Sequence, residues 1–185
     1  MGTFAQWETP SRGAFLRVKL CAETSFAFVF FSYISHCRYA RWKRTYQAGI
    51  YFQGVGVHLV GNEISWAPHT GINGIGNECL FEENYLHDLC YEVRDSGAFY
   101  VGRSWSERGN IVRNNAFENI VLSPETVHGT NEVSAIYLDD QISGWQITNN
   151  TFANCFQGRV VVNVLTTCQV GYTLGVSAGL SHLNG

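Results

Sequence analysis

Two adjacent aspartates, Asp139 and Asp140, end the apolar run of the stretch "AIYLDDQISGW", just before a glycine turn. Two like charges placed side by side are either a solvated strand end or groups positioned for chemistry. Carboxyl groups serve as general acids, general bases and nucleophiles in enzymes. We therefore take Asp139 and Asp140 as the first candidate catalytic residues.

Other side chains could complete a site with these aspartates. Asp95 and Glu92 lie in "CYEVRDSG" and could supply a second carboxylate. His69 follows Pro68, and it could bond a hydroxyl group or titrate near neutral pH, although a single loop histidine is more often a turn residue. The sequence shows neither a CxxC pair nor a His-x₃-His pair among its six cysteines and six histidines, so we expect buried thiols, no metal site and no cofactor.

The composition indicates the elements that must hold these residues. The chain has 185 residues, 45% of them apolar and 15% charged, which favours one domain with a substantial core. Nineteen glycines and only three prolines favour short strands joined by tight turns, and hence an all-β protein.

Charge and hydropathy argue against two classes of partner. Residues 1–49 hold seven of the twelve basic residues and two of the fifteen acidic ones, so the remainder has a net charge of five minus thirteen, or −8. No nucleic-acid-binding surface is expected from this distribution. The apolar run 26–34 is too short to span a bilayer, so no membrane association is expected either. The single glycosylation pattern Asn149-Asn150-Thr151 only weakly favours an extracellular location.

A repeat underlies the chain. Four segments share an asparagine with apolar residues three before it and two after it, and a fifth segment carries Ser32 in its place. A second short strand follows each copy at variable distance, starting at a glycine or serine. The asparagines are Asn62, Asn84, Asn115 and Asn150, and the second strands begin at Gly49, Gly71, Gly97, Ser134 and Gly158.

Alternation along the second strands predicts which side chains face the core. With the strands aligned on their first residues, one set is largely apolar and is expected to point inward, whereas Tyr100, Tyr137 and Asp139 are expected to point outward. The inward set is Tyr51, Gln53, Ile75, Phe99, Val101, Ile136, Leu138, Val160 and Val162.

A unit of 22 residues, from Asn62 to Asn84, fits one turn of a parallel β-helix. We predict about five coils over residues 26–163, with residues 1–25 and 164–185 unassigned. Stacked coils place equivalent asparagines about 4.8 Å apart, so the four asparagines should form a structural amide ladder.

The repeat and its loops resemble a known family. The stretch "PHTGI…GN…LFEENYLHDLCYEVRDSGAFYVGRSWSERGN", together with "AIYLDDQISGWQITNNTF", is similar to right-handed, single-stranded parallel β-helix proteins of the pectate-lyase-like superfamily, in particular a branch related to β-helix glycoside hydrolases. The resemblance covers roughly residues 32–158. It implies a solenoid that binds or cleaves polysaccharide in a groove along one sheet. Many relatives carry an aspartate where this chain has Ser104, and the region after Gly158 departs from the family pattern, which suggests a truncated fragment.

Within such a groove, Tyr100 and Tyr137 would form an aromatic floor suited to the apolar faces of sugar rings. The alternative is that they only stack on the surface and stabilise the sheet. Asp139 would act as acid, base or nucleophile, while Arg103 pairs with Asp140. Trp105 would belong to one wall of the groove, and His69 and Glu92 to the other.

The second carboxylate remains open at the level of sequence. Asp95 lies seven residues from the level of Asp139, or roughly 20 Å along extended strands, which exceeds the roughly 5–10 Å that a glycosidase pair requires. The alternatives are Asp139 with Asp140, or a loop that folds Glu92 and Asp95 inward. The expected function is a polysaccharide or glycoside hydrolase. The alternative is a non-catalytic module that binds glycans or supports a larger chain, and a Ca²⁺-dependent lyase is the weaker third option.

Overall fold

The computed structural model describes residues 48–122, 133–155 and 160 with their side chains. Seven further strand segments are described by their backbone alone, at 6–8, 15–19, 27–30, 33–34, 161–162, 169–170 and 174–175. The described residues form strands and turns, with no helix among them. No helix long and apolar enough to cross a membrane therefore occurs in this part of the chain.

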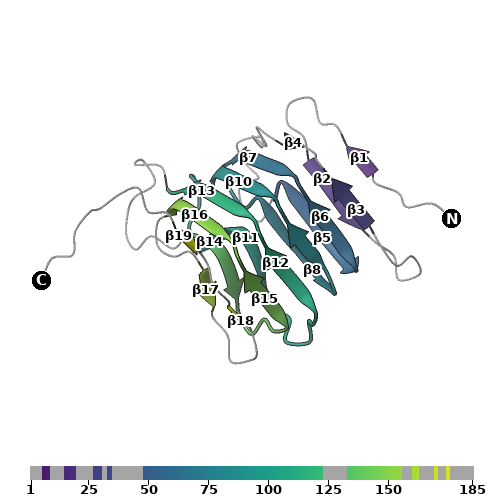
Figure 1. Cartoon of the computed structure of the whole chain (residues 1–185). Helices are drawn as coiled ribbons and strands as arrows, with labels where there is room; N and C mark the ends of the chain where they lie inside the picture. Colours follow the sequence, from purple (N-terminus) through teal and green to yellow (C-terminus); the bar gives the residue numbers. More distant parts are fainter. Residues whose placement is uncertain are drawn as a thin grey trace, which may run out of the picture.

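The strands belong to three sheets (Figure 1). Sheet A contains β1 (Gln6–Glu8), β2 (Phe15–Lys19), β5 (Ile50–Val55), β8 (Ile72–Asn77), β11 (Ser96–Gly102), β14 (Val133–Asp139) and β17 (Val160–Val162). Sheet B contains β3 (Ala27–Phe30), β6 (Val57–Val60), β9 (Leu80–Glu82), β12 (Asn110–Arg113), β15 (Trp145–Thr148) and β18 (Gln169–Val170). Sheet C contains β4 (Tyr33–Ile34), β7 (Glu63–Ala67), β10 (Tyr85–Leu89), β13 (Ala116–Ile120), β16 (Thr151–Cys155) and β19 (Leu174–Gly175).

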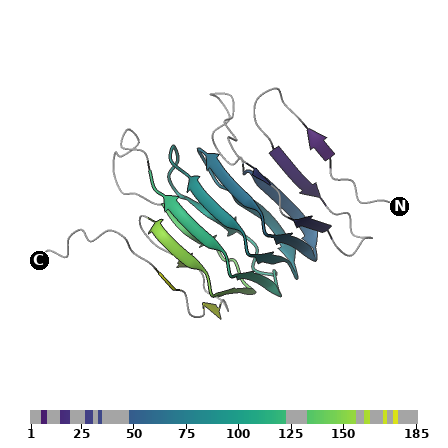
Figure 2. The ribbon, with the colours of Figure 1, turned by 45° about the horizontal axis from the view of Figure 1, so that its top comes forward.

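From β2 onward, the chain visits the three sheets in rotation, and each strand pairs in parallel with the third strand after it. The strands consequently follow one another in chain order along the stack, as the colour sequence in Figures 1 and 2 shows. β1 pairs antiparallel with β2. This all-β arrangement of parallel strands in three sheets is compatible with the predicted β-helix. Paired strands lie on both sides of the predicted range 26–163, because β2 precedes it and β18 and β19 follow it.

The predicted asparagine ladder is confirmed. The Nδ2 atoms of Asn62, Asn84 and Asn115 each donate to the Oδ1 atom of the next ladder asparagine, at 2.9, 2.9 and 3.0 Å. The same Oδ1 atoms also accept the backbone N–H of the preceding ladder residue at 2.9–3.0 Å. All four asparagines, Asn150 included, are buried, so the ladder satisfies polar groups at the turns that precede β7, β10, β13 and β16.

The residue before each ladder asparagine adopts the left-handed backbone region. Gly61 has a φ of 68°, and Glu83, Asn114 and Asn149 each have a φ of 56°. Glycine and asparagine tolerate this region best, which accounts for the pairs Gly61-Asn62, Asn114-Asn115 and Asn149-Asn150. The ladder thus depends on a turn that the residue types in the sequence indicate.

One part of the predicted alternation is wrong. The register pairs Ile72 with Phe99, so Gly71 lies opposite Ala98 and not opposite Gly97. Tyr51, Gln53 and Ile75 therefore share the outward face, and Ile75 is 41% exposed. A slip of one residue exchanges the two faces of a strand. The predicted inward positions Phe99, Val101, Ile136 and Leu138 are confirmed.

The predicted alignment is shifted by one residue because Gly71 does not mark the start of the repeat. Gly71 is a glycine because a neighbouring side chain packs against its backbone. A Cβ atom on Gly71 would lie 2.7 Å from the Leu89 side chain. Gly74 has a similar role, because a Cβ atom there would lie 2.5 Å from the Phe52 ring. Large side chains of neighbouring coils occupy the space that these two glycines leave, and glycine positions alone therefore misalign the strands.

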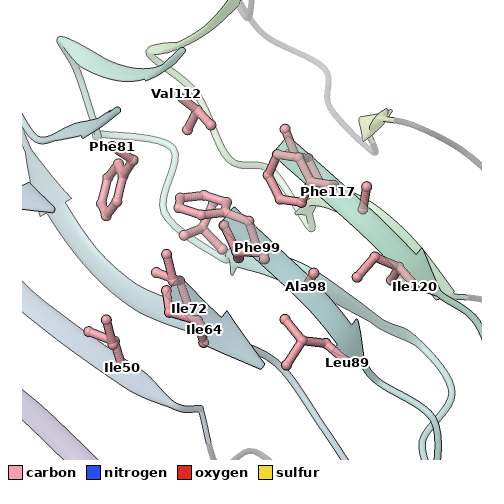
Figure 3. Close-up of a cluster of buried hydrophobic side chains, with 14 of the residues drawn as sticks. Ile50, Ile64, Ile72, Phe81, Leu89, Ala98, Phe99, Val112, Phe117 and Ile120 are labelled. Atoms are coloured by element: carbon pink, nitrogen blue, oxygen red, sulfur yellow. The ribbon is translucent and has the colours of Figure 1, made fainter. Parts of the chain in front are cut away.

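The core fills the space between the three sheets (Figure 3). Phe99 from sheet A, Phe81 from sheet B and Phe117 from sheet C point into it. The Phe81 ring contacts the rings of Phe52, Phe99 and Trp145 at centroid distances of 4.8, 4.9 and 5.9 Å. Burial of these aromatic side chains holds successive coils in register and fixes the outer face of sheet A.

Candidate functional site

The outer face of sheet A carries a column of polar and aromatic side chains. Tyr51, Asn73, Tyr100 and Tyr137 occupy equivalent positions on β5, β8, β11 and β14. The predicted equivalence of Tyr100 and Tyr137 is confirmed, and their rings meet edge to face at a centroid distance of 5.5 Å. Sequence reasoning missed Tyr51 and Asn73 because of the register slip.

Each of the two neighbouring tyrosines binds a carboxylate. The Tyr100 hydroxyl donates to Asp139 Oδ2 at 2.7 Å, and the Tyr137 hydroxyl donates to Asp95 Oδ1 at 3.3 Å. Burial and the neighbouring carboxylates raise the pKa of both phenols above the usual value, Asp139 acting on both and Asp95 forming a hydrogen bond with Tyr137. The two hydroxyls therefore stay protonated and act as donors over the physiological pH range.

Asp139 is oriented by hydrogen bonds on both of its carboxylate oxygens. Oδ1 accepts the backbone N–H of Asp140 at 2.9 Å, and Oδ2 accepts the Tyr100 hydroxyl. The residue is only 6% exposed, and Tyr137 beside it is 9% exposed. Asp139 lies beside Tyr100 as predicted. The expectation that it faces an open groove is wrong, because the residue is buried. The reason is that the neighbouring phenol occupies the space above the carboxylate.

Asp140 points toward Arg103 as predicted, but it lies in the turn after β14 with a φ of 37°, so the turn and not strand alternation sets its direction. Its Oδ2 accepts a hydrogen bond from Arg103 Nε at 3.0 Å, which confirms the predicted ion pair. The side chains of Arg103 and Asp140 are 74% and 55% exposed, so water screens the pair and it contributes on the order of 0–1 kcal/mol to stability. The backbone N–H of Arg103 also donates to the carbonyls of Asp139 and Asp140, which ties together the turns that follow β11 and β14.

The Tyr137 side chain connects Asp95 with Asp139. Gly102 lies opposite Asp139, and Asp95 precedes Gly102 by seven residues, an offset of roughly 20 Å along extended strands. The Tyr137 hydroxyl nevertheless donates to Asp95 Oδ1 at 3.3 Å. Burial, the charges of Asp139 and Asp95, and hydrogen bonds to both carboxylates raise the pKa of Tyr137. Asp95 therefore folds inward toward Asp139, which favours the predicted alternative of an inward-folded loop.

Trp105 lies on the turn after β11 and is 76% exposed. Its backbone is held in place, because the Ser143 hydroxyl donates to the Trp105 carbonyl at 2.6 Å. A fixed backbone under an exposed indole provides a flat apolar surface on this turn, two residues after Arg103.

His69 lies in the turn before β8 and Glu92 in the turn before β11, and each makes hydrogen bonds within the turns. The backbone N–H of Thr70 donates to His69 Nδ1 at 2.8 Å, so this nitrogen is an acceptor and the ring is neutral. Burial lowers the pKa of His69 to about 4. Glu92 is half-buried, and its backbone N–H donates to the Pro68 carbonyl at 3.2 Å. These contacts favour the turn-residue interpretation of His69.

A further acidic residue escaped sequence reasoning. Glu107 is buried, and its Oε2 accepts the indole N–H of Trp145 at 2.8 Å. Its position one coil before Trp145 follows from the register, in which Asn110 pairs with Trp145. In the described part of the chain, no cluster of three or more histidine, cysteine, aspartate or glutamate side chains could hold a metal ion.

Comparison with known proteins adds no further assignment, since no family model, curated protein or solved structure matches the chain.

Proposed function

We propose that the chain is a right-handed, single-stranded parallel β-helix of the pectate-lyase-like type, and that it binds a polysaccharide or oligosaccharide on the outer face of sheet A. The rotation of strands among three sheets and the buried asparagine ladder support the fold. The observation that carries the binding function is the column Tyr51–Asn73–Tyr100–Tyr137, which runs across four successive strands.

The column suits an extended chain of sugar rings for two reasons. Aromatic rings pack against the apolar faces of sugars, while carboxylate and amide groups accept and donate hydrogen bonds to hydroxyls. Tyr51, Asn73 and Tyr100 are half-buried, so each presents part of its side chain to solvent. Trp105 adds an exposed ring on the turn that follows β11.

Hydrolysis is the second candidate function, and the fixed orientation of Asp139 favours it. A carboxylate that accepts hydrogen bonds on both oxygens is held in one geometry, as catalysis requires. Asp95 is the candidate second carboxylate, because the Tyr137 hydroxyl forms hydrogen bonds with both Asp95 and Asp139, whereas Asp140 binds Arg103. Asp139 is only 6% exposed, which restricts the access of a glycosidic bond to it, so binding without cleavage has the stronger support.

A pair of matched variants tests binding. Tyr100→Ala removes a ring from the column, whereas Tyr85→Ala removes a half-buried tyrosine on sheet C that likewise donates to a carboxylate, that of Glu118. In affinity electrophoresis against a panel of polysaccharides, Tyr100→Ala and Trp105→Ala should each weaken binding of the retained glycan by about tenfold. Tyr85→Ala should leave binding unchanged. Equal losses in Tyr85→Ala and Tyr100→Ala, or no retention by any glycan, would contradict the proposal.

The same panel separates hydrolysis from binding. If reducing ends appear with the unaltered protein, Asp139→Asn should abolish their release while the fold persists, because the amide still accepts from the Asp140 N–H and can donate to the Tyr100 oxygen. Unchanged cleavage by Asp139→Asn would remove its catalytic role. Retention of a glycan without release of reducing ends would leave binding as the function.

A further inference from the structure

The turn between β11 and β12 contains a carboxyl group that the proposed site does not use. Glu107 is 5% exposed, and its Oε2 accepts hydrogen bonds from Trp145 Nε1 at 2.8 Å and from Asn110 Nδ2 at 3.3 Å. Its other oxygen, Oε1, is buried without a hydrogen-bond partner. A buried carboxyl with one unsatisfied oxygen is costly when ionised and much less so when neutral.

This carboxyl lies where two successive coils are fastened together. The Ser143 hydroxyl donates to the carbonyls of Trp105 and Glu107, at 2.6 and 3.3 Å. Gly144 packs directly on the same turn, because a Cβ atom there would lie 2.1 Å from the Glu107 carbonyl oxygen. The turn 103–109 is thus held against residues 143–145 by a small set of contacts, and the Glu107–Trp145 hydrogen bond is the buried one between side chains.

The surroundings of Glu107 favour its protonated, neutral form. Burial raises its pKa to about 7, against the opposing effects of hydrogen bonds from the Trp145 side chain, the Gly76 backbone and the Ser104 side chain. The titratable group that faces it from the previous coil is the Cys79 thiol, and burial raises the pKa of Cys79 to about 11, so that the thiol stays neutral. Glu78 and Arg108 flank the turn as an ion pair at 4.0 Å, and their side chains are 61% and 74% exposed, so water screens both charges.

We propose that Glu107 is a proton-operated latch, whose neutral carboxyl holds the turn 103–109 against residues 143–145 and whose ionised form loosens that turn. The proposal goes beyond carbohydrate binding and does not require it. Because Arg103 and Trp105 lie on the same turn, the latch would also make the wall beside the tyrosine column pH-sensitive.

Hydrogen exchange followed by mass spectrometry tests the latch in the full chain. Because burial raises the pKa of Glu107 to about 7 in the closed turn, protection of the peptide covering residues 103–109, corrected for intrinsic exchange, should fall by up to tenfold per pH unit from about pH 5 to about pH 7. Protection should level off above about pH 7, where the closed and the open forms have both lost the proton. Glu107→Gln is neutral at every pH and keeps an oxygen for the Trp145 indole, so its protection should not depend on pH. Glu78→Gln, an exposed neighbour, should behave as the unaltered chain does. A flat profile in the unaltered chain, or the same fall in Glu107→Gln, would overturn the proposal.

A second measurement covers the case in which Glu107→Gln does not fold. Carbon-detected NMR of the unaltered chain, labelled on glutamate, should show one carboxyl titrating near pH 7 together with a change in the Trp145 indole N–H signal at the same midpoint. If all glutamate carboxyls titrate near their ordinary values, or if the indole signal does not follow the titration, the latch is refuted.

Discussion

At the scale of single residues, His87 on sheet C shows how one titratable group can link coils. Its Nδ1 lies 2.7 Å from Asp88 Oδ2, and its Nε2 lies 3.1 Å from Glu63 Oε1. Carboxylate oxygens only accept hydrogen bonds, so both ring nitrogens must carry protons to satisfy both contacts. The Tyr85 ring stacks on the imidazole at a centroid distance of 4.3 Å and adds a cation–π contact.

These contacts predict a pH-dependent contribution to stability. Burial lowers the pKa of His87, but the bonds to Asp88 and Glu63 outweigh it, and the pKa is raised overall. A raised pKa means that the contribution is fully present below the unfolded value of about 6.5 and is lost as the pH rises through the folded value. His87→Gln should therefore lower the free energy of unfolding by roughly 1 kcal/mol at pH 5.5 and by less at pH 8.5.

Urea denaturation of both proteins at four pH values from 5.5 to 8.5 would check the His87 prediction. The difference between the two proteins is the quantity to compare, because Glu107 titrates in the same range and affects both equally. A difference that grows with rising pH would contradict the assignment of a charged imidazole.

At the scale of elements, the asparagine ladder joins the turns of successive coils. Asn115 is an internal member whose Oδ1 accepts from the N and Nδ2 atoms of Asn84, and whose Nδ2 donates to Asn150 Oδ1 and to the Phe81 carbonyl. Four buried hydrogen bonds therefore meet at one side chain, and removing it leaves the Asn84 backbone N–H without an acceptor.

Asn115→Leu should lower the free energy of unfolding by about 3 kcal/mol, the cost of leaving buried polar groups unsatisfied. Chemical denaturation monitored by circular dichroism would measure the loss. Gln146→Leu is the control, because it removes the same kind of side-chain amide from an exposed position on β15. It should change the free energy of unfolding by less than about 0.5 kcal/mol. Comparable values for the two variants would argue that the ladder does not support the coil.

At the scale of the whole molecule, aromatic packing connects coils that are distant in the sequence. Phe81 lies within ring contact of Phe52, Phe99 and Trp145, which belong to three other strands. Phe81 is 1% exposed. Truncation of its side chain would therefore leave a cavity inside the close-packed core.

Phe81→Ala should cost about 3–5 kcal/mol, a large fraction of the stability of a single domain. Thermal melting of the full chain would report it, and Trp105→Ala, which removes an exposed aromatic side chain, should melt like the unaltered protein. If Phe81→Ala leaves the melting temperature unchanged, the core described by this cluster does not hold the coils together.

Much of the fold and part of the site could be predicted from residue types with local causes. The ladder asparagines and the turns before them follow from backbone conformations that few residue types tolerate. The Arg103–Asp140 pair follows from the alignment of β11 with β14, which stacks the turns after the two strands. The burial of Asp139 and the role of Glu107 could not be predicted, because each depends on a side chain supplied by another coil, Tyr100 and Trp145 respectively.

The sequence by itself determined the all-β class of the fold and the residues of the ladder, because these follow from turn conformation and from apolar spacing along one segment. Only the tertiary structure decided the register of β5 and β8 against β11. Gly71 and Gly74 are glycines because the Leu89 and Phe52 side chains fill the space beside them, so their positions do not mark the start of the repeat. That register brings Tyr51 and Asn73 into line with the tyrosines of β11 and β14. Contacts between coils depend on which strand lies opposite which, and spacing along the chain does not encode this when loop lengths vary.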